Sequence, residues 1–162
     1  MHAEDDCFAI RQAARYVSQL YDRHLGRVGI TTTQFSIMYK LQRGVSMTMR
    51  QLADAMVMDR TTLVRAIQPL QRDGFIAMDD RAAPDCKART LKLTDAGLTK
   101  LDHAHDHWHA AQRDFEQQFG AERAASLRRE LFAMTHYPVR NQTAPTAPHT
   151  HDSEDNAQPQ SA

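Results

Sequence analysis

Two helix-start signals stand close together in this sequence, and they constrain the fold more than any other feature. Thr48 with Gln51 has the spacing of a capping box, which predicts a short helix that ends near Met56. Asp59 then provides a second N-cap, because its carboxylate can accept the exposed N–H groups of the residues that follow. Two helices joined by so short a turn must cross steeply. The pattern therefore predicts a helix-turn-helix, whose second helix can enter the major groove of DNA.

The second helix of this motif is expected to present two different faces. Leu63, Ile67 and Leu70 recur at helical spacing, which is typical of a face packed on a core. Pro69 is expected to kink the helix or free one carbonyl, and Gly74 to end it in the left-handed conformation. The polar residues of the two helices are candidates for contact with phosphates and base edges, with a merely solvated surface as the alternative. They are Arg50, Arg60, Thr61, Thr62, Arg65 and Gln68.

Two short β-strands are predicted after this helix, over residues 75–78 and 89–93, which stand on both sides of a polar segment. The polar segment, residues 79–88, is long and charged, so we expect a hairpin with an extended tip. A hairpin directly after a helix-turn-helix is a wing, which lies along the phosphate backbone or in a minor groove. Lys87 and Arg89 are the candidate DNA contacts of this wing.

The chain resembles the multiple-antibiotic-resistance regulator (MarR) family of bacterial transcription factors from residue 7 to about residue 136. Four local patterns, in the family's order and spacing, support this resemblance: residues 25–35 with Gly29-Ile30-Thr31 and Gln34-Phe35, residues 58–75, residues 85–89 and residues 93–97. The resemblance implies one mainly α-helical domain over residues 1–136 with a small β-wing. In it, a winged helix-turn-helix lobe at about 44–94 lies between N- and C-terminal helices, at about 5–30 and 95–136, that form a dimerisation layer.

The resemblance also implies a function, that of a homodimeric repressor which binds a pseudo-palindromic site on double-stranded DNA and is released by a small aromatic or phenolic effector. The family's effector pocket lies between the dimerisation helices and the lobe, and its candidate residues here are Tyr21, His24, His105 and Trp108. Asp85 matches a wing aspartate that pairs with an arginine and braces the hairpin; the alternative is an ordinary turn aspartate. Lys87 stands where the family usually has arginine, and because lysine is more strongly hydrated we expect weaker minor-groove contact.

Helices outside the lobe are predicted from apolar residues at helical spacing. A first helix over residues 5–25 is apolar on more than one side, as expected of a helix that packs on its own domain and on a partner chain. Thr31 and Thr94 start two further helices, the second of which runs to about Gln118. A final helix at about 121–136 is expected to bury Leu127, Leu131, Phe132 and Met134. The polar, proline-containing residues 137–162 are expected to be a disordered tail.

Composition places few limits on function. The formal net charge is +0, so DNA binding is argued locally, from a modest excess of basic over acidic residues in residues 43–92. The two cysteines do not indicate a disulfide scaffold, and neither a leader peptide nor a membrane span is apparent. We therefore expect a cytoplasmic protein that does not contact membranes. No catalytic motif is apparent, and neither enzymatic activity nor a cofactor is expected.

A redox signal is one alternative to a small effector. Cys7 followed by Phe8, with Tyr21 fourteen residues on, is similar to the organic-hydroperoxide-sensing branch of the family. In that branch the first-helix cysteine is oxidised and a tyrosine at this spacing hydrogen-bonds it. Arg11 and Thr32 stand where that branch has further tyrosines, and simple packing of Cys7 is the competing interpretation.

A zinc-responsive regulator is the second alternative. The pairs His103–His107 and His105–His109 have the i, i+4 spacing with which helical histidines bind zinc. The two pairs lie on roughly opposite sides of one helix, so they cannot form a single four-ligand site. Such a site would have to recruit His24 or a partner chain.

Overall fold

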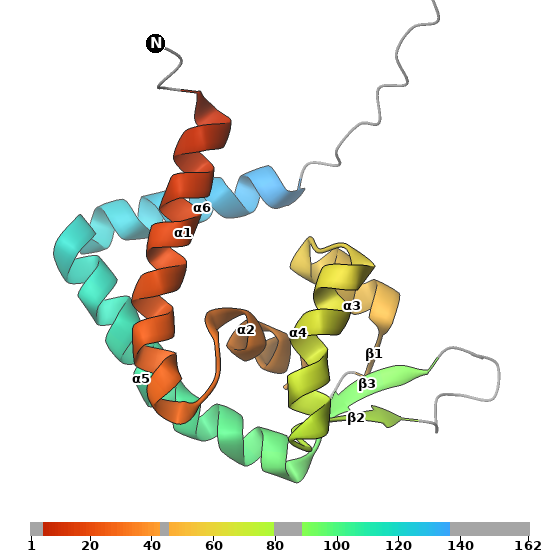
Figure 1. Ribbon diagram of the computed structural model, residues 1–162. Helices are drawn as coiled ribbons and strands as arrows, with labels where there is room; N and C mark the ends of the chain where they lie inside the picture. Colours follow the sequence, from red (N-terminus) through yellow and green to blue (C-terminus); the bar gives the residue numbers. More distant parts are fainter. Residues whose placement is uncertain (1–4, 43–45, 80–88, 137–162) are drawn as a thin grey trace, which may run out of the picture.

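The computed structural model describes residues 5–42, 46–79 and 89–136. Within these ranges the chain is mainly helical with a small sheet (Figure 1), which confirms the predicted fold class. The predicted wing tip, with Asp85, Cys86 and Lys87, and the predicted tail lie outside the described residues. The elements in chain order are α1 (Asp6–Leu25), the 3-10 helix η1 (Gly26–Val28), α2 (Thr32–Leu41), β1 (Met47–Thr48), α3 (Met49–Met56), α4 (Arg60–Arg72), β2 (Ile76–Asp79), β3 (Thr90–Leu93), α5 (Asp95–Phe119) and α6 (Ala121–His136).

Each predicted N-cap residue forms its capping hydrogen bond. Thr31 and Thr48 each begin a helix with a reciprocal capping box. The Asp59 carboxylate accepts the backbone N–H of Thr62 at 2.9 Å at the start of α4, and Thr94 caps α5 in the same way. Because α3 and α4 each have their own cap, the chain can change direction between them within a three-residue turn, residues 57–59.

That turn contains a feature with no signal in the sequence. Val57 adopts φ 52°, in the left-handed region that β-branched residues rarely occupy, and its N–H caps the end of α3. Its side chain is 74% exposed, so little packing offsets a backbone strain on the order of 1–2 kcal/mol. Gly74, which ends α4, adopts φ 75°, as predicted.

The sheet joins the wing to the helix-turn-helix. Its three antiparallel strands are ordered β1-β3-β2. The predicted hairpin is confirmed as β2 and β3, with Ala77 opposite Lys92, and the Lys92 ammonium lies 3.1 Å from the Asp79 carboxylate. The two-residue β1, which pairs Met47 with Leu91, was not predicted because it is too short to show alternation. It ties the start of α3 to the base of the wing.

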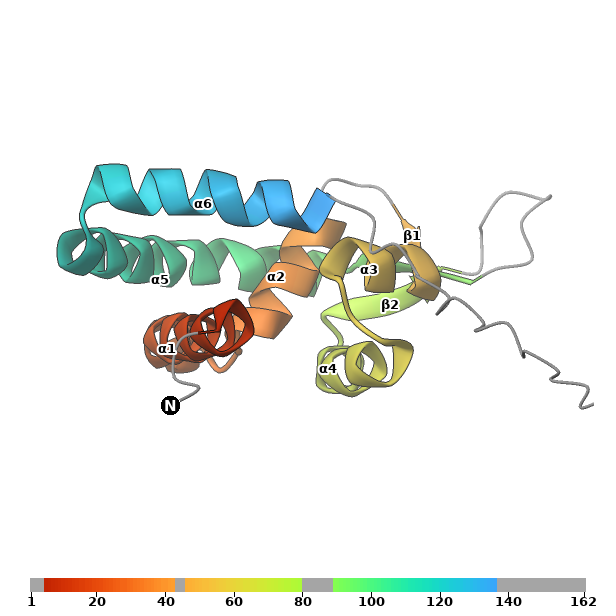
Figure 2. The ribbon, with the colours of Figure 1, turned by 90° about the horizontal axis from the view of Figure 1, so that it is seen from above.

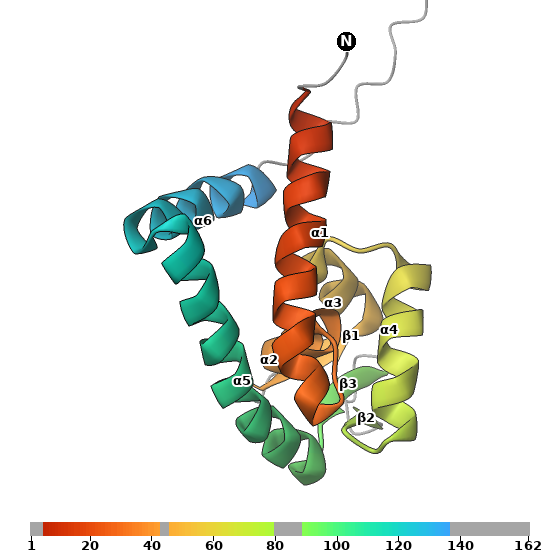
Figure 3. The same cartoon turned by 60° about the vertical axis from the view of Figure 1, so that its left-hand side comes forward.

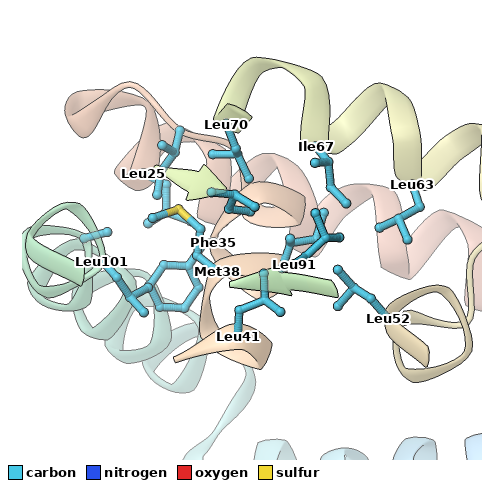
Figure 4. Close-up of a cluster of buried hydrophobic side chains, with 14 of the residues drawn as sticks. Leu25, Phe35, Met38, Leu41, Leu52, Leu63, Ile67, Leu70, Leu91 and Leu101 are labelled. Carbon is cyan, nitrogen blue, oxygen red and sulfur yellow. The ribbon is translucent and has the colours of Figure 1, made fainter. Parts of the chain in front are cut away.

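The core of the lobe lies beneath α4 (Figure 4). Leu63, Ile67 and Leu70 form the inner face of this helix, as predicted, and all three are buried. The same cluster contains buried residues from α1, α2, α3, β3 and α5: Leu25, Phe35, Met38, Leu41, Leu52, Leu91 and Leu101. Since α1 and α5 contribute to it, both flanking helices are anchored in the lobe.

Gly97 allows the first turn of α5 to lie directly against the backbone at Phe75. A Cβ atom at this position would collide with the backbone carbonyl of Phe75, which cannot move aside as a flexible side chain would. The glycine is therefore required by a close approach of two backbones.

Outside the lobe, α5 lies between α1 and α6 (Figure 2). We call these three helices the helical layer; Figure 3 shows α1 with α5 on one side and the lobe on the other. Leu20, Tyr21 and Ala111 form a small second cluster between α1 and α5. None of the helices in the described ranges is both long and apolar enough to cross a membrane.

The helical layer leaves apolar surfaces open, and one of them corrects a prediction. The four apolar residues of α6 that were expected to be buried are exposed: Leu127, Leu131, Phe132 and Met134. The reason is that α6 packs mainly on α5, so one side of the helix remains uncovered. The N-terminal half of α1 is also exposed, with Phe8 51% accessible.

Candidate nucleic-acid interface and aromatic cluster

The outer side of α4 presents a row of polar side chains opposite the buried face. Thr61, Arg65, Gln68 and Arg72 recur at intervals of four, three and four residues, so they share one side of the helix. All four are exposed. Arg72 was missed in the sequence, although its spacing from Gln68 would have revealed it; its guanidinium lies 3.0 Å from the carboxylate of Asp73. We call these four residues the outer row.

Arg60 and Thr62, two other predicted contacts, lie on the flanks of α4 rather than in the outer row. At about 100° per residue, each is turned by roughly a quarter turn from the middle of the row. Thr62 donates its hydroxyl proton to the Asp59 carboxylate at 2.6 Å, so it has no free donor for a phosphate. Arg60 is exposed, and like Arg65 it forms no hydrogen bond or ion pair with another residue in the described ranges.

Asp59 keeps a negative charge at the start of α4. The hydroxyl of Thr62, and after it the backbone N–H of the same residue, hold the pKa of Asp59 below its ordinary value by hydrogen bonding to the carboxylate. An ionised carboxylate at a helix N-terminus also interacts favourably with the helix dipole. The cap therefore orders the end of α4 from which the outer row begins.

The remaining predicted DNA contacts lie on α3 and in the wing. Arg50 of α3 is exposed, and its distance of 4.0 Å to the exposed Asp54 carboxylate is a weak contact that leaves the guanidinium accessible. Arg89 is exposed directly before β3, at the base of the wing. The bracing role proposed for Asp85 falls outside the described residues, as does Lys87. Within the described part of the hairpin, Lys92 and Asp79 join the two strands.

Three of the four predicted pocket residues meet around Phe35 of α2. Trp108 stacks on the Phe35 ring with centroids 5.9 Å apart, and His105 approaches the same ring edge-on at 5.7 Å. Tyr21 contacts Trp108 edge-on at 6.1 Å. We call Tyr21, Phe35, His105 and Trp108 the aromatic cluster. Because these rings touch one another, a ligand entering here must displace at least one of them.

His24 lies apart from these rings. Its Nε2 atom is 2.9 Å from the Asp114 carboxylate, which connects α1 to α5. Its Nδ1 atom is buried and has no hydrogen-bond partner among the described residues. The structure therefore gives His24 a helix-to-helix contact instead of a place in the aromatic cluster.

Cys7 and Tyr21 do not meet within one chain. They are fourteen residues apart on one continuous helix, which places them about 21 Å apart along its axis. The Tyr21 hydroxyl donates to Gln112 of α5 instead, at 2.5 Å. Cys7 is exposed, so the packing role is not seen in the single chain either. Any contact between Cys7 and Tyr21 requires two chains.

The histidines of α5 do not converge on a metal site in the described residues. No group of three or more histidine, cysteine, aspartate or glutamate side chains is arranged there to hold an ion. The rings of His105 and His109 lie 6.3 Å apart, and His103 is exposed on another side of the helix, one turn before His107.

Comparison with known proteins identifies the family of this chain. The sequence model of the MarR family matches residues 30–78, which include α2, α3 and α4. The DNA-bound crystal structure of the M. tuberculosis transcriptional regulator MosR is 31% identical, with a TM-score of 0.70, and the match covers 82% of this chain and 94% of that chain. An uncharacterised HTH-type transcriptional regulator of Bacillus cereus is 25% identical over 119 residues, 74% of this chain and 78% of its own length.

Wild-type MarR from E. coli shows the same fold at lower identity. Its crystal structure is 18% identical, has a TM-score of 0.66, and matches over 82% of this chain and 98% of that chain. The relatives are regulators of transcription, not enzymes, which agrees with the expectation drawn from the sequence. The chain belongs to the MarR family of transcriptional regulators.

Proposed function

We propose that this chain is a homodimeric transcriptional repressor of the cytoplasm that binds a pseudo-palindromic DNA operator through α4. The observation that most supports this proposal is the division of α4 into a buried face and an outer row. A helix whose inner side is fixed by Leu63, Ile67 and Leu70 holds its outer side chains at defined positions, as base recognition in a major groove requires. The DNA-bound structure of the similar regulator MosR supports the same use of the fold.

Arg65 occupies the middle of the outer row and is the residue assigned to a guanine edge, with its two-pronged guanidinium. Gln68, one turn further, has the amide that pairs with adenine. Arg50 of α3 and Arg89 at the base of the wing are assigned to phosphates, which position the lobe without reading the sequence. Arg60 and Thr62, on the flanks, have smaller roles in this assignment.

The dimer is proposed from the open apolar surfaces of the helical layer. Phe8 and Ile10 of α1, and Leu131 and Phe132 of α6, are large apolar side chains that the chain itself leaves accessible. Exposed apolar residues concentrated on two helices are typical of a surface that a partner covers. A second copy of this chain would bury them and would place two α4 helices side by side on DNA.

The effector is proposed to enter at the aromatic cluster. This cluster joins α1 and α5 of the helical layer to α2, which packs on the lobe, and a planar aromatic or phenolic molecule can replace one of its rings with little loss of stacking. Such a molecule releases DNA if it prefers a dimer whose α4 helices are wrongly spaced. A hundredfold preference corresponds to about 2.7 kcal/mol, within the usual range of allosteric coupling.

Selection of binding sites from random DNA duplexes tests the proposal. We expect the protein to enrich a two-fold symmetric sequence whose half-sites are centred about 10 base pairs apart, since two α4 helices would occupy successive major grooves. Sedimentation of the complex should give two chains per site. Enrichment of one asymmetric half-site with one chain bound would contradict the dimer, and the absence of any enriched sequence would contradict operator recognition.

A further inference from the structure

A run of polar contacts crosses all three helices of the helical layer. The Tyr21 hydroxyl of α1 donates to the Gln112 amide oxygen at 2.5 Å, and the Gln112 amide nitrogen donates to the Glu116 carboxylate at 2.6 Å, both on α5. The Arg128 guanidinium of α6 lies 3.3 Å from the same Glu116 oxygen. Since α5 lies between α1 and α6 (Figure 2), this run connects the two outer helices through the middle one.

The Gln112 amide satisfies both of its neighbours in only one orientation. Tyr21 gives its proton to the carbonyl end of Gln112, and the NH₂ end of Gln112 faces the acceptor Glu116. Turning the amide over would set its carbonyl against the carboxylate, so each contact fixes the next. Burial raises the pKa of the Tyr21 phenol, while Arg128 lowers that pKa and Glu116 raises it.

One end of this run touches the aromatic cluster, because the Tyr21 ring packs edge-on against Trp108. The other end lies on α6, where Arg128 is the neighbour of the exposed Leu127. The proposed effector position and the proposed dimer surface are therefore joined by consecutive hydrogen bonds and an ion pair.

We propose that Tyr21, Gln112, Glu116 and Arg128 form a relay that couples the aromatic cluster to the position of α6. When a ligand displaces the Tyr21 ring, Gln112 loses its donor and Glu116 is no longer held in place, so Arg128 and α6 are released from their fixed position on α5. The coupling is reciprocal, since whatever holds α6 also holds Tyr21 against Trp108. As a route of regulation, the relay rests on the proposed effector site and dimer; as a physical coupling it exists in the single chain.

The chain contains a matched control for this relay. Tyr16 donates to Gln118 at 2.6 Å, a second tyrosine–glutamine bond between α1 and α5. Gln118 forms no hydrogen bond to the described residues of α6. Removing the Gln118 amide therefore deletes the same kind of contact without interrupting a connection to α6.

The test uses Trp108, the single tryptophan of the chain, as a probe of the full-length protein. Arg128→Met is introduced into wild type, into Gln112→Leu and into Gln118→Leu. In wild type we expect Arg128→Met to loosen Tyr21 on Trp108, so that tryptophan emission shifts to longer wavelength and acrylamide quenching rises. The same shift should appear in Gln118→Leu and be lost in Gln112→Leu. Gln112→Asn, which keeps the amide but shortens its reach, should behave as Gln112→Leu and replaces it if that variant does not fold.

Two results would overturn the relay: no shift on Arg128→Met in wild type, or an equal shift in the presence and absence of Gln112. These measurements need neither DNA nor an effector, so failure of the proposed operator binding or dimer leaves their meaning unchanged. Conversely, loss of the shift in Gln112→Leu, together with a wild type that selects no DNA sequence, would support the coupling and reject the proposed function.

Discussion

The winged-helix lobe and the helical layer differ in how they use their apolar residues. In the lobe, Leu63 and Ile67 of α4 are completely covered by residues of the same chain, whereas in the helical layer Leu131 and Phe132 of α6 stay exposed, Phe132 by 61%. The lobe therefore buries its apolar residues within one chain, with help from α1 and α5, while the helical layer keeps apolar surface exposed, which the proposed partner chain would cover.

The largest effect on stability is expected from a substitution in the core of the lobe. Leu63→Ala should lower the free energy of unfolding by about 2–5 kcal/mol, because it leaves a cavity among fully buried neighbours. Leu131→Ala removes the same atoms from an exposed site and should change the unfolding of the dilute monomer by only about 0.5 kcal/mol. Urea denaturation at low protein concentration measures both values. Equal losses would remove the distinction between the two regions.

Self-association should depend on the exposed side of α6. Leu131→Lys places a charge on the exposed side of α6 and should weaken self-association by a large factor, because the charge would lose its water in an interface. Leu98→Lys, at another exposed apolar position on α5, is the matched control. Sedimentation over a range of concentrations measures both. If the two variants dissociate alike, α6 is not the dimer surface.

A smaller gain is expected in the turn between α3 and α4. Val57→Asn should raise the free energy of unfolding by about 1 kcal/mol, since asparagine tolerates the left-handed conformation that strains valine. The Val57 side chain is so exposed that its removal loses little burial. Thermal melts give the result. An unchanged or lower melting temperature would mean that the valine side chain is better packed than its exposure indicates.

The smallest effect is a pH dependence at the start of α4. Because hydrogen bonds lower the pKa of Asp59 below 3.8, its stabilising effect is complete at higher pH and is lost as pH falls through the folded-state value. Asparagine caps a helix without titrating. We therefore expect wild type to melt higher than Asp59→Asn at neutral pH, and the difference to shrink in acid. A difference that is constant from neutral pH to about pH 2 would contradict the charged cap.

The sequence predicted most of the lobe because local chemistry determines it. The caps at Thr48 and Asp59 are formed by residues three positions apart, so they need no distant part of the chain. The spacing of Leu63, Ile67 and Leu70 specifies one buried face. The αL conformation of Val57 was not predictable, because no glycine or asparagine marks it.

The candidate sites were less accessible to sequence reasoning. The spacing of apolar residues in α6 indicated an apolar side of the helix but not which element covers it. Burial of these residues was therefore wrongly expected. Phe35 was not predicted to belong to the pocket, although two of the predicted pocket residues, His105 and Trp108, contact its ring. In the sequence, Gln112 and Glu116 are indistinguishable from other polar residues on the surface of a helix. Their connection to Tyr21 is seen only in the structure, where Tyr21 donates to Gln112 and Gln112 donates to Glu116.

Arg65 provides the most direct test that the outer row of α4 recognises DNA. Arg65→Ala is compared with Arg113→Ala, an exposed arginine of α5 outside the lobe, by measuring affinity for the selected operator and for unrelated DNA at one salt concentration. We expect Arg65→Ala to weaken operator binding by about 1–3 kcal/mol and to reduce the preference for operator over unrelated DNA. Arg113→Ala should leave both near the wild-type values. Equal operator affinity for the two variants would contradict this expectation.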